Sequence, residues 1–380
     1  MDHRDIPGRT GPPPAIGEHA LGATAAAVAN AIKHLSPGYF ALVMATGIVS
    51  IAAWDFDLRI VAFALFAFNL VAYVVVACLT ALRAVRYPQL LFADMTDHRL
   101  APRFFAAVAG SCIVGTQFLQ IARSPATAIA FLTLGTVLWF ALTYTIFTIL
   151  TVKRDKPPVE QGITSGWLMA VVATQSIAVL AAFIAREWPQ PARLEVNFFA
   201  LSMWLWGGML YIWIISLIFY RYRFFIFSPR DLTPSYWINM GAMAISTLAG
   251  AAFVENAPHA PFLASLLPFL KGFTVFYWAT GTWWIPMLLF LSVWRHVIEH
   301  FPLRYDPLYW AAVFPLGMYT VATKHMAEAL ALPFLAPLPK GVFAVALAAW
   351  VVASIGLAWE LLRGPHGRSA FGHPPPVETK

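Results

Sequence analysis

Two histidines and a glutamate in the sequence HVIEH, namely His296, Glu299 and His300, have the spacing of an inverted zinc-protease motif. On a helix this spacing places both imidazoles on one face, as metal ligands require. A catalytic zinc also needs a third protein ligand and a water-accessible cleft, and no downstream segment offers an obvious third ligand. We therefore predict no metal site, no cofactor and no catalytic residue. We interpret the motif, with Arg295 and Arg304, as a charged group at the membrane interface.

A second ionisable group, Lys324, His325 and Glu328, lies in the otherwise apolar segment AAVFPLGMYTVATKHMAEA. An unpaired charge near the middle of a membrane helix costs ~2.5–3.5 kcal/mol on insertion scales, and less near the interface. Lys324 either concentrates anions at the outer mouth of a pore or only snorkels and pairs with Glu328, four residues further on. His325 leaves open a mechanism in which proton movement is coupled to transport.

The composition indicates where these residues must lie. The chain has 380 residues, of which 60% are hydrophobic and 11% charged, whereas about 25% of residues are charged in an average soluble domain. The apolar runs are continuous and as long as helices, which favours a helical bundle over the alternating pattern of a membrane barrel. We predict an all-α integral membrane protein. Its net charge of +7 is concentrated in particular loops, so we expect the lipid bilayer, and no nucleic acid, as its partner.

Ten apolar runs are long enough to cross a bilayer, because about 20 helical residues rise roughly 30 Å. They are expected at 36–54, 60–82, 104–122, 127–152, 166–185, 196–220, 236–255, 269–294, 308–328 and 341–362. The transmembrane domain is thus predicted over 36–363. The polar, Pro/Gly-rich segments 1–35 and 364–380 are predicted to be disordered tails.

Lys and Arg are unevenly distributed between the two sides of these spans. The tails and the loops that follow even-numbered spans hold most of them, and the loops that follow odd-numbered spans hold far fewer. By the positive-inside rule both termini, and therefore both tails, lie in the cytoplasm, as an even number of spans requires. The predicted location is the plasma (inner) membrane, crossed in multiple passes.

The odd-numbered spans carry most of the amides, glycines and hydroxyls. These spans begin at similar intervals along the chain, which predicts five pseudosymmetric helical hairpins. We expect the odd spans to surround a wet central pore and the even spans to pack outside them. The alternative is that the polar groups only bridge helices. The predicted pore-lining residues are Thr46, Gly47, Thr116, Gln117, Gln175, Asn239, Thr320, Lys324 and His325.

Three features together resemble the tellurite-resistance and C4-dicarboxylate transporter family, which includes malate permeases, sulfite exporters and slow anion channels. They are the opening PGYFALVMATGIVS, the hairpin spacing and the ninth-span sequence AAVFPLGMYTVATKHMAEA. The resemblance covers residues 36–362. It implies ten helices, five of them around a central pore, a homotrimer with one pore per subunit, and a phenylalanine that occludes the pore. The tellurite-resistance branch tends to carry a proline after GYF, where this chain reads ALVMATG, so the substrate stays open.

Phe314 is the residue that matches the occluding phenylalanine of that family. An aromatic ring in a narrow apolar constriction blocks a pore until the ring changes rotamer. Pro315, which follows, removes a helical hydrogen bond and favours a kink that would aim the ring inward. Without the resemblance, a phenylalanine in a membrane helix is expected to contact the core or lipid.

The sequence therefore predicts a transporter of small anions, such as C4-dicarboxylates, sulfite, tellurite, chloride or nitrate, with a phenylalanine-gated pore in each protomer. Acidic residues are nearly absent from the odd spans, where only the terminal Glu255 and Glu328 occur, and mid-membrane carboxylates would repel anions. This favours a channel. The alternatives are a proton-coupled secondary transporter for malate or sulfite and, from another class, an intramembrane metalloenzyme that uses the His296 motif.

Overall fold

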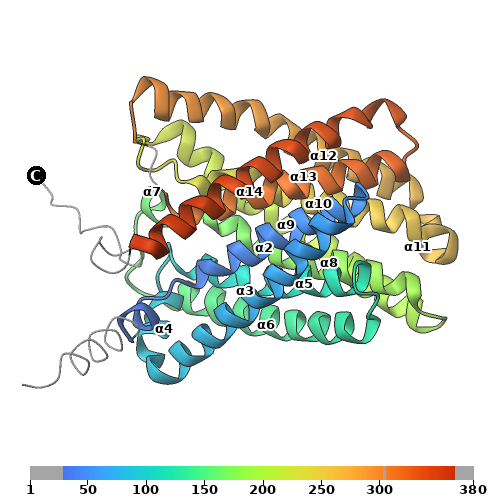
Figure 1. Cartoon of the computed structure of the whole chain (residues 1–380), viewed down its shortest axis with the longest axis horizontal. Coiled ribbons are helices and arrows are strands. Elements are labelled where there is room, and N and C mark those ends of the chain that lie inside the picture. The colour runs from blue at the N-terminus through green and yellow to red at the C-terminus, as the bar shows by residue number, and fades with distance from the viewer. Residues whose placement is uncertain (1–28, 303–304, 364–380) are drawn as a thin grey trace, which may run out of the picture.

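The computed structural model describes residues 29–302 and 305–363, and within them it contains helices and turns but no strand. Figure 1 views the bundle from the side, with most long helices running roughly from left to right. The predicted tails lie outside the described residues, except that residues 29–33 form a short helical turn. The protein is all-helical.

Five buried helices form the centre of the bundle. Each packs against the next along the chain, and the last packs against the first, so that they close a ring. Small and apolar side chains fill these helices, which lets their backbones approach closely. The inner helices are α2 (Phe40–Asp55), α5 (Phe105–Gln120), α8 (Met169–Glu187), α10 (Ile238–Asn256) and α13 (Trp310–Ala329).

Five longer helices surround this ring, and each packs against the inner helix that precedes it. They are α3 (Arg59–Arg86), α6 (Pro125–Val152), α9 (Ala192–Phe224), α12 (Leu267–Val293) and α14 (Pro337–Arg363). Every one of them exposes large apolar side chains, for example Ile60, Val137, Phe198, Phe290 and Val352. An apolar surface of this extent indicates contact with lipid.

Seven helices of the described residues are long and apolar enough to cross a membrane. They comprise α2, α3, α6, α8, α9, α10 and α14 with their flanking turns. The remaining long helices are less apolar or shorter: α5 has 16 residues, α12 is rich in Trp, Tyr and Thr, and α13 includes Lys324 and Glu328. The protein is therefore a membrane protein. The count of ten spans and the pseudosymmetry of the hairpins stay predictions.

A short 3-10 turn precedes every inner helix. The turns are η1 (Pro37–Tyr39), η2 (Ala101–Phe104), η3 (Ser165–Leu168), η4 (Pro234–Trp237) and η7 (Pro307–Tyr309). Four of them have a proline in the first two positions, where its fixed φ suits a helix start and its missing N–H is not needed. The side chains of Ser36 and Asp306 cap two of the turns, at 3.2 and 2.8 Å from the amides of Gly38 and Leu308.

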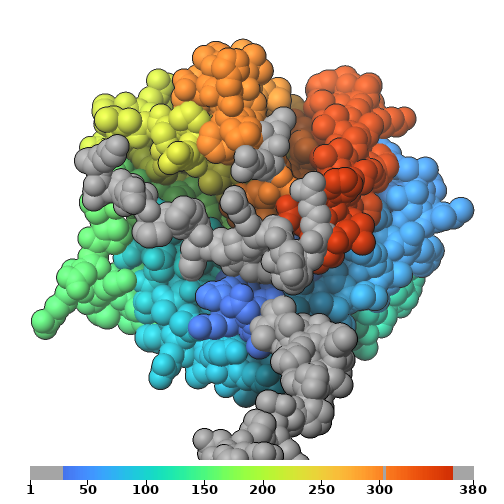
Figure 2. Space-filling view, turned by 60° about the vertical axis from the view of Figure 1, so that its left-hand side comes forward, coloured from blue at the N-terminus to red at the C-terminus, as the bar shows by residue number. Residues whose placement is uncertain are grey.

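All five turns therefore lie at one end of the ring, together with the short helices α4 (Pro88–Met95) and α7 (Val159–Gly162) on the left of Figure 1. Figure 2 looks toward this end, where successive segments follow one another around the molecule in chain order. The opposite end carries η5 (Ala257–His259), α11 (Pro261–Ser265) and η8 (Pro333–Leu335). A π-helical turn, η6 (Trp294–Ile298), ends α12.

Candidate functional site

The starts of the five inner helices surround a cavity of about 280 Å³, which we call the vestibule. Each start contributes two residues three positions apart, and this spacing puts both on one face of the helix. The pairs are Gly38 and Ala41, Arg103 and Ala106, Gly166 and Met169, Ser235 and Ile238, and Leu308 and Ala311. The vestibule therefore lies on the axis of the ring.

Four arginines and one carboxylate also line the vestibule: Arg99, Arg103, Arg221, Arg230 and Asp231. Arg221 donates to the carbonyl of Ile163 at 3.1 Å and pairs with Asp231 at 3.0 Å. Partial burial opposes ionisation of Asp231, but hydrogen bonds from Ser228 and the Arg221 charge outweigh it and lower the pKa of this carboxyl. The other three guanidiniums have no carboxylate among the vestibule residues, although Asp306, Asp94 and Asp97 act on Arg103 from outside the lining. The lining itself therefore carries a net positive charge.

The helix starts add to this positive potential. Backbone N–H groups in the first turn of a helix have no helical acceptor, and the helix dipole places partial positive charge there. Five such starts converge on the vestibule. Arginines and helix N-termini in one cavity favour the binding of anions.

A narrower cavity of about 10 Å³, the axial cavity, lies further along the ring and is lined by residues of all five inner helices. Its volume corresponds to about one water molecule. Its walls are mostly apolar, namely Ile48, Ile51, Ile113, Val179, Phe183, Ile245, Leu248 and Met318. The hydroxyls of Thr116 and Ser176 also belong to it, but each donates to a carbonyl of its own helix.

Phe314 lies on α13 between the residues that line the two cavities, and it belongs to the lining of neither. Ala311 lines the vestibule and Met318 lines the axial cavity, and Phe314 is one turn from each on the same face of α13. Its side chain is buried, with 1% of its surface exposed. Pro315 removes the N–H that would bond the carbonyl of Ala311. A Cβ on Gly241 would lie 2.7 Å from Pro315 Cγ, so glycine at this position allows α10 to pack closely against α13.

The three predicted amides point toward outer helices. Gln117 accepts a hydrogen bond from Asn69 of α3 at 2.7 Å. Gln175 donates to the carbonyl of Trp204 in α9 at 3.0 Å, and Asn239 donates to the Tyr222 hydroxyl of α9 at 3.3 Å. The structure thus places these amides between inner and outer helices, where they stabilise the packing of the two layers.

The predicted threonines and glycine occupy different places. Thr46 accepts a hydrogen bond from the Trp350 indole of α14 at 2.9 Å, and Thr320 donates to the carbonyl of Leu316. A Cβ on Gly47 would collide with Ile113, so this glycine packs against α5. Of the predicted pore-lining residues on α2, α5, α8 and α10, Thr116 lines the axial cavity and the others do not.

Indole-to-threonine hydrogen bonds recur around the ring. Besides the Thr46 pair, Trp139 of α6 donates to Thr174 of α8 at 2.8 Å, and Trp278 of α12 donates to Thr323 of α13 at 3.1 Å. Each bond satisfies an indole N–H that lipid cannot satisfy. Tryptophans of the outer layer thereby fix the position of inner helices.

Lys324 and His325 both lie near the end of α13 but have different partners. Lys324 pairs with Glu328 at 2.6 Å on the same helix. His325 is largely buried and lies between Asp55 of α2 and Glu255 of α10. The structure brings His325, but not Lys324, into contact with the neighbouring inner helices.

The HVIEH segment begins within the π-helical turn η6. The Nδ1 atom of His296 lies 2.9 Å from the carbonyl oxygen of Phe301, and His300 follows the turn with a positive φ of 49°. Among residues 29–302 and 305–363, no group of three or more His, Cys, Asp or Glu side chains has a geometry suited to a metal ion.

Sequence reasoning missed the arginines of the vestibule and the role of Asp55. The arginines occupy loops and helix ends far apart in the chain, and only the closed ring brings them together. Asp55 is the last residue of α2, one position beyond the predicted end of the first span. The repeated helix starts were a usable signal, since Pro37 and Pro102 are 65 residues apart, Pro234 and Pro307 are 73 apart, and the third start, which lacks a proline, lies between the two pairs.

Comparison with known proteins agrees with this geometry. The sequence profile of the voltage-dependent anion channel (SLAC1) family matches residues 34–358, most of the chain. The protein belongs to the SLAC1 family. This match confirms the family predicted from the sequence, a membrane family of anion channels and transporters.

Several relatives of this SLAC1-family protein are similar over much of their length. An uncharacterized membrane protein of Mycobacterium tuberculosis is 40% identical over 163 residues, which cover 42% of this chain and 82% of the relative. An uncharacterized transporter of Methanocaldococcus jannaschii is 27% identical over 309 residues, covering 78% and 84% of the two chains. A second one from the same organism is 26% identical over 311 residues, covering 78% and 85%.

Proposed function

We propose that this protein is a channel for small anions, whose path in each protomer runs from the vestibule past Phe314 into the axial cavity. The observation that carries the proposal is the position of the cationic vestibule. Five helix starts and four arginines meet on the axis of the ring, one helical turn before Phe314. Membership of an anion channel family supports the same path.

The proposed path is closed in this conformation. The axial cavity has room for about one water molecule, and its walls offer few polar groups to a permeating ion. An anion that entered it would lose its hydration without replacement. Rotation of the Phe314 ring, together with widening of the ring of helices, is the proposed opening step.

The proposed substrates are C4-dicarboxylates, sulfite, tellurite, chloride and nitrate. The family fits an anionic substrate, and the vestibule, at about 280 Å³, is large enough for a dicarboxylate. No residue of the axial cavity is acidic, so no carboxylate in it repels an anion. Flux assays with each of these anions distinguish among them.

The proposed arrangement in the membrane follows the charge distribution. We place the vestibule at the cytoplasmic side of the plasma (inner) membrane, because the termini and most of the Lys- and Arg-rich loops belong to that end. Ten spans, cytoplasmic tails over 1–35 and 364–380, and a homotrimer with one path per subunit complete the proposal.

Replacement of the phenylalanine tests this path. In proteoliposomes, Phe314→Ala should raise chloride or nitrate flux at least about tenfold over the unchanged protein, because it removes the ring that separates the two cavities. Phe253→Ala is the matched control. Phe253 is equally buried on an inner helix, but its ring packs against Trp204 of the outer layer.

The control should lower the unfolding temperature without raising flux. A folded Phe314→Ala variant with unchanged flux for every anion would contradict the proposed path.

A second candidate function is proton-coupled transport of malate or sulfite. The observation that favours it is His325, a titratable and largely buried side chain between two carboxylates at the end of the ring. Reversal potentials separate the two functions. A channel follows the Nernst potential of the anion, whereas the reversal potential of a coupled carrier shifts with pH at a fixed anion gradient.

A further inference from the structure

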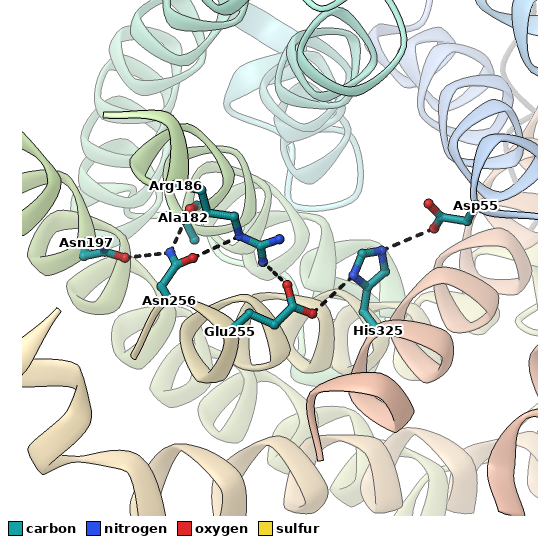
Figure 3. A network of polar contacts seen from close by, with 7 residues as sticks. All are labelled: Asp55, Ala182, Arg186, Asn197, Glu255, Asn256 and His325. Carbon is teal, nitrogen blue, oxygen red and sulfur yellow. Dashed lines mark hydrogen bonds and ion pairs between the residues drawn. The ribbon is translucent and has the colours of Figure 1, made fainter. Parts of the chain in front are cut away.

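Four ionisable side chains meet at the end of the ring opposite the vestibule (Figure 3). They are Asp55, Arg186, Glu255 and His325, which we call the outer network. They come from the ends of α2, α8 and α10 and from the last turns of α13, so four of the five inner helices contribute. The anion path proposed above does not use them.

His325 is at the centre of the outer network. Its Nε2 lies 3.3 Å from Asp55 Oδ2, and its Nδ1 lies 3.6 Å from Glu255 Oε1. The imidazole, which belongs to α13, therefore links the ends of α2 and α10. Asp55 Oδ2 and His325 Nε2 are buried atoms without a hydrogen bond among the described residues, so the ion pair between them is the interaction that offsets their burial.

Arg186 extends the outer network to α8. It forms an ion pair with the second oxygen of Glu255 and donates to Asn256 Oδ1 at 2.9 Å. Asn256 in turn donates to the carbonyl of Ala182 and to Asn197 Oδ1, both at 2.9 Å. Figure 3 shows the resulting row of contacts, which runs from Asn197 to Asp55 across the ring.

The outer network lies directly against the axial cavity through Phe183. The Phe183 ring lines that cavity. Its centroid is 6.0 Å from the His325 ring and 4.8 Å from the guanidinium carbon of Arg186. On the path proposed above, an anion that has passed Phe314 and the axial cavity therefore reaches the outer network next.

The charge state of His325 determines whether both contacts are attractive. An imidazolium has two N–H donors and attracts both carboxylates, and with Arg186 it balances their charge. A neutral imidazole has one N–H, so the lone pair of its other nitrogen faces a carboxylate. The excess negative charge then makes Asp55 and Glu255 repel each other.

Other charged groups near this end are paired elsewhere or exposed to solvent. Lys324 pairs with Glu328 on α13, and Arg59 pairs with Asp57 beyond α2. Glu187 follows Arg186 on α8, and Lys340, on the first turn of α14, is exposed. Within residues 29–302 and 305–363, His325 is thus the one titratable side chain in contact with both carboxylates of the outer network.

We propose that the outer network is a second gate in series with Phe314, closed when an imidazolium at His325 holds Asp55 and Glu255 together. Loss of its proton at higher pH opens this gate by separating the ends of α2 and α10. The inference rests on the proposed anion path, because only a path along the ring axis crosses both gates.

Flux through two gates in series is tested with Phe314→Ala, His325→Gln and the double variant in proteoliposomes. His325→Gln alone should change flux less than about twofold, since Phe314 still closes the path. The double variant should exceed Phe314→Ala at least about fivefold at pH near 6. Flux through Phe314→Ala should rise several-fold between about pH 7 and pH 10, and flux through the double variant should not.

The matched control is Phe314→Ala with Glu328→Gln, which breaks the neighbouring Lys324 pair but leaves the outer network intact. It should retain the pH dependence of Phe314→Ala. Equal flux through Phe314→Ala and the double variant at every pH, or flux that falls as pH rises, would overturn the second gate. Unchanged flux in Phe314→Ala overturns the anion path itself, which is a different result.

A distance measurement tests the gate without reference to flux. Spin labels at Leu58→Cys and His259→Cys, both exposed positions just beyond α2 and α10, report the separation of those helix ends. The exposed Cys78 is replaced by serine, and Cys112 is buried. The distance should increase from about pH 7 to pH 10 and stay constant with His325→Gln. A distance that does not change with pH overturns the gate.

Discussion

The two ends of the inner ring carry similar charged residues in different surroundings. At the vestibule, four arginines face a cavity of about 280 Å³ that includes one carboxylate. At the opposite end, an arginine and a histidine lie between two carboxylates and contact them directly. Access to a cavity and pairing with an opposite charge, more than residue type, therefore decide whether a charge attracts ions or holds helices together.

The largest expected effect comes from breaking the paired end. Arg186→Gln leaves Glu255 partly buried without its guanidinium, so the free energy of unfolding should fall by about 2–3 kcal/mol. Thermal unfolding in detergent measures this loss. Adding Glu255→Gln should recover part of it, because the two residues act as a pair. An unfolding temperature that does not change would mean that these charges contribute nothing to the fold.

An intermediate effect is expected at the vestibule, on flux instead of stability. In the Phe314→Ala background, Arg103→Ala with Arg230→Ala should lower anion flux about tenfold at low salt, because it removes cationic charge from the cavity. High salt should reduce the difference by screening. Arg123→Ala, at an exposed site on the opposite side, is the control and should not change flux. Equal flux with and without the two arginine substitutions would contradict the proposed role of the vestibule charge.

The smallest effect concerns the one carboxylate of the vestibule. Because the pKa of Asp231 is lowered in the folded protein, its ionised form stabilises the 225–233 loop above the ordinary carboxyl pKa of about 3.8. This contribution is lost as pH falls through the lowered folded value. Asp231→Asn should therefore lower the unfolding temperature at pH 7 but not in strong acid. A constant difference between the two proteins across this pH range would contradict the assignment.

The sequence was sufficient for the features set by composition and local pattern. Apolar length predicted the membrane class, and polar content separated the segments that became inner helices from those that became outer ones. The predicted start of the first span at Ser36 lies four residues before α2, because the Ser-Pro-Gly sequence forms a 3-10 turn first. The PGYF and ninth-span motifs identified the family.

The direction of individual side chains was beyond that reasoning. Gln117 and Gln175 lie on inner helices, but a helix presents residues on all sides, and both amides bond to the outer layer. Composition assigns a polar residue to a helix without assigning it to a face. Asp55 and Arg103 sit at helix ends, where an error of one or two residues hides their role, and their partners come from distant segments.

The narrowness of the axial cavity has a consequence for the cell. Protons cross membranes along continuous chains of water, and a site with room for about one water, walled by Ile48, Ile113 and Leu248, cannot hold such a chain. A closed copy of this protein therefore leaks no protons through its centre. A membrane that holds many copies in this conformation would keep its proton gradient.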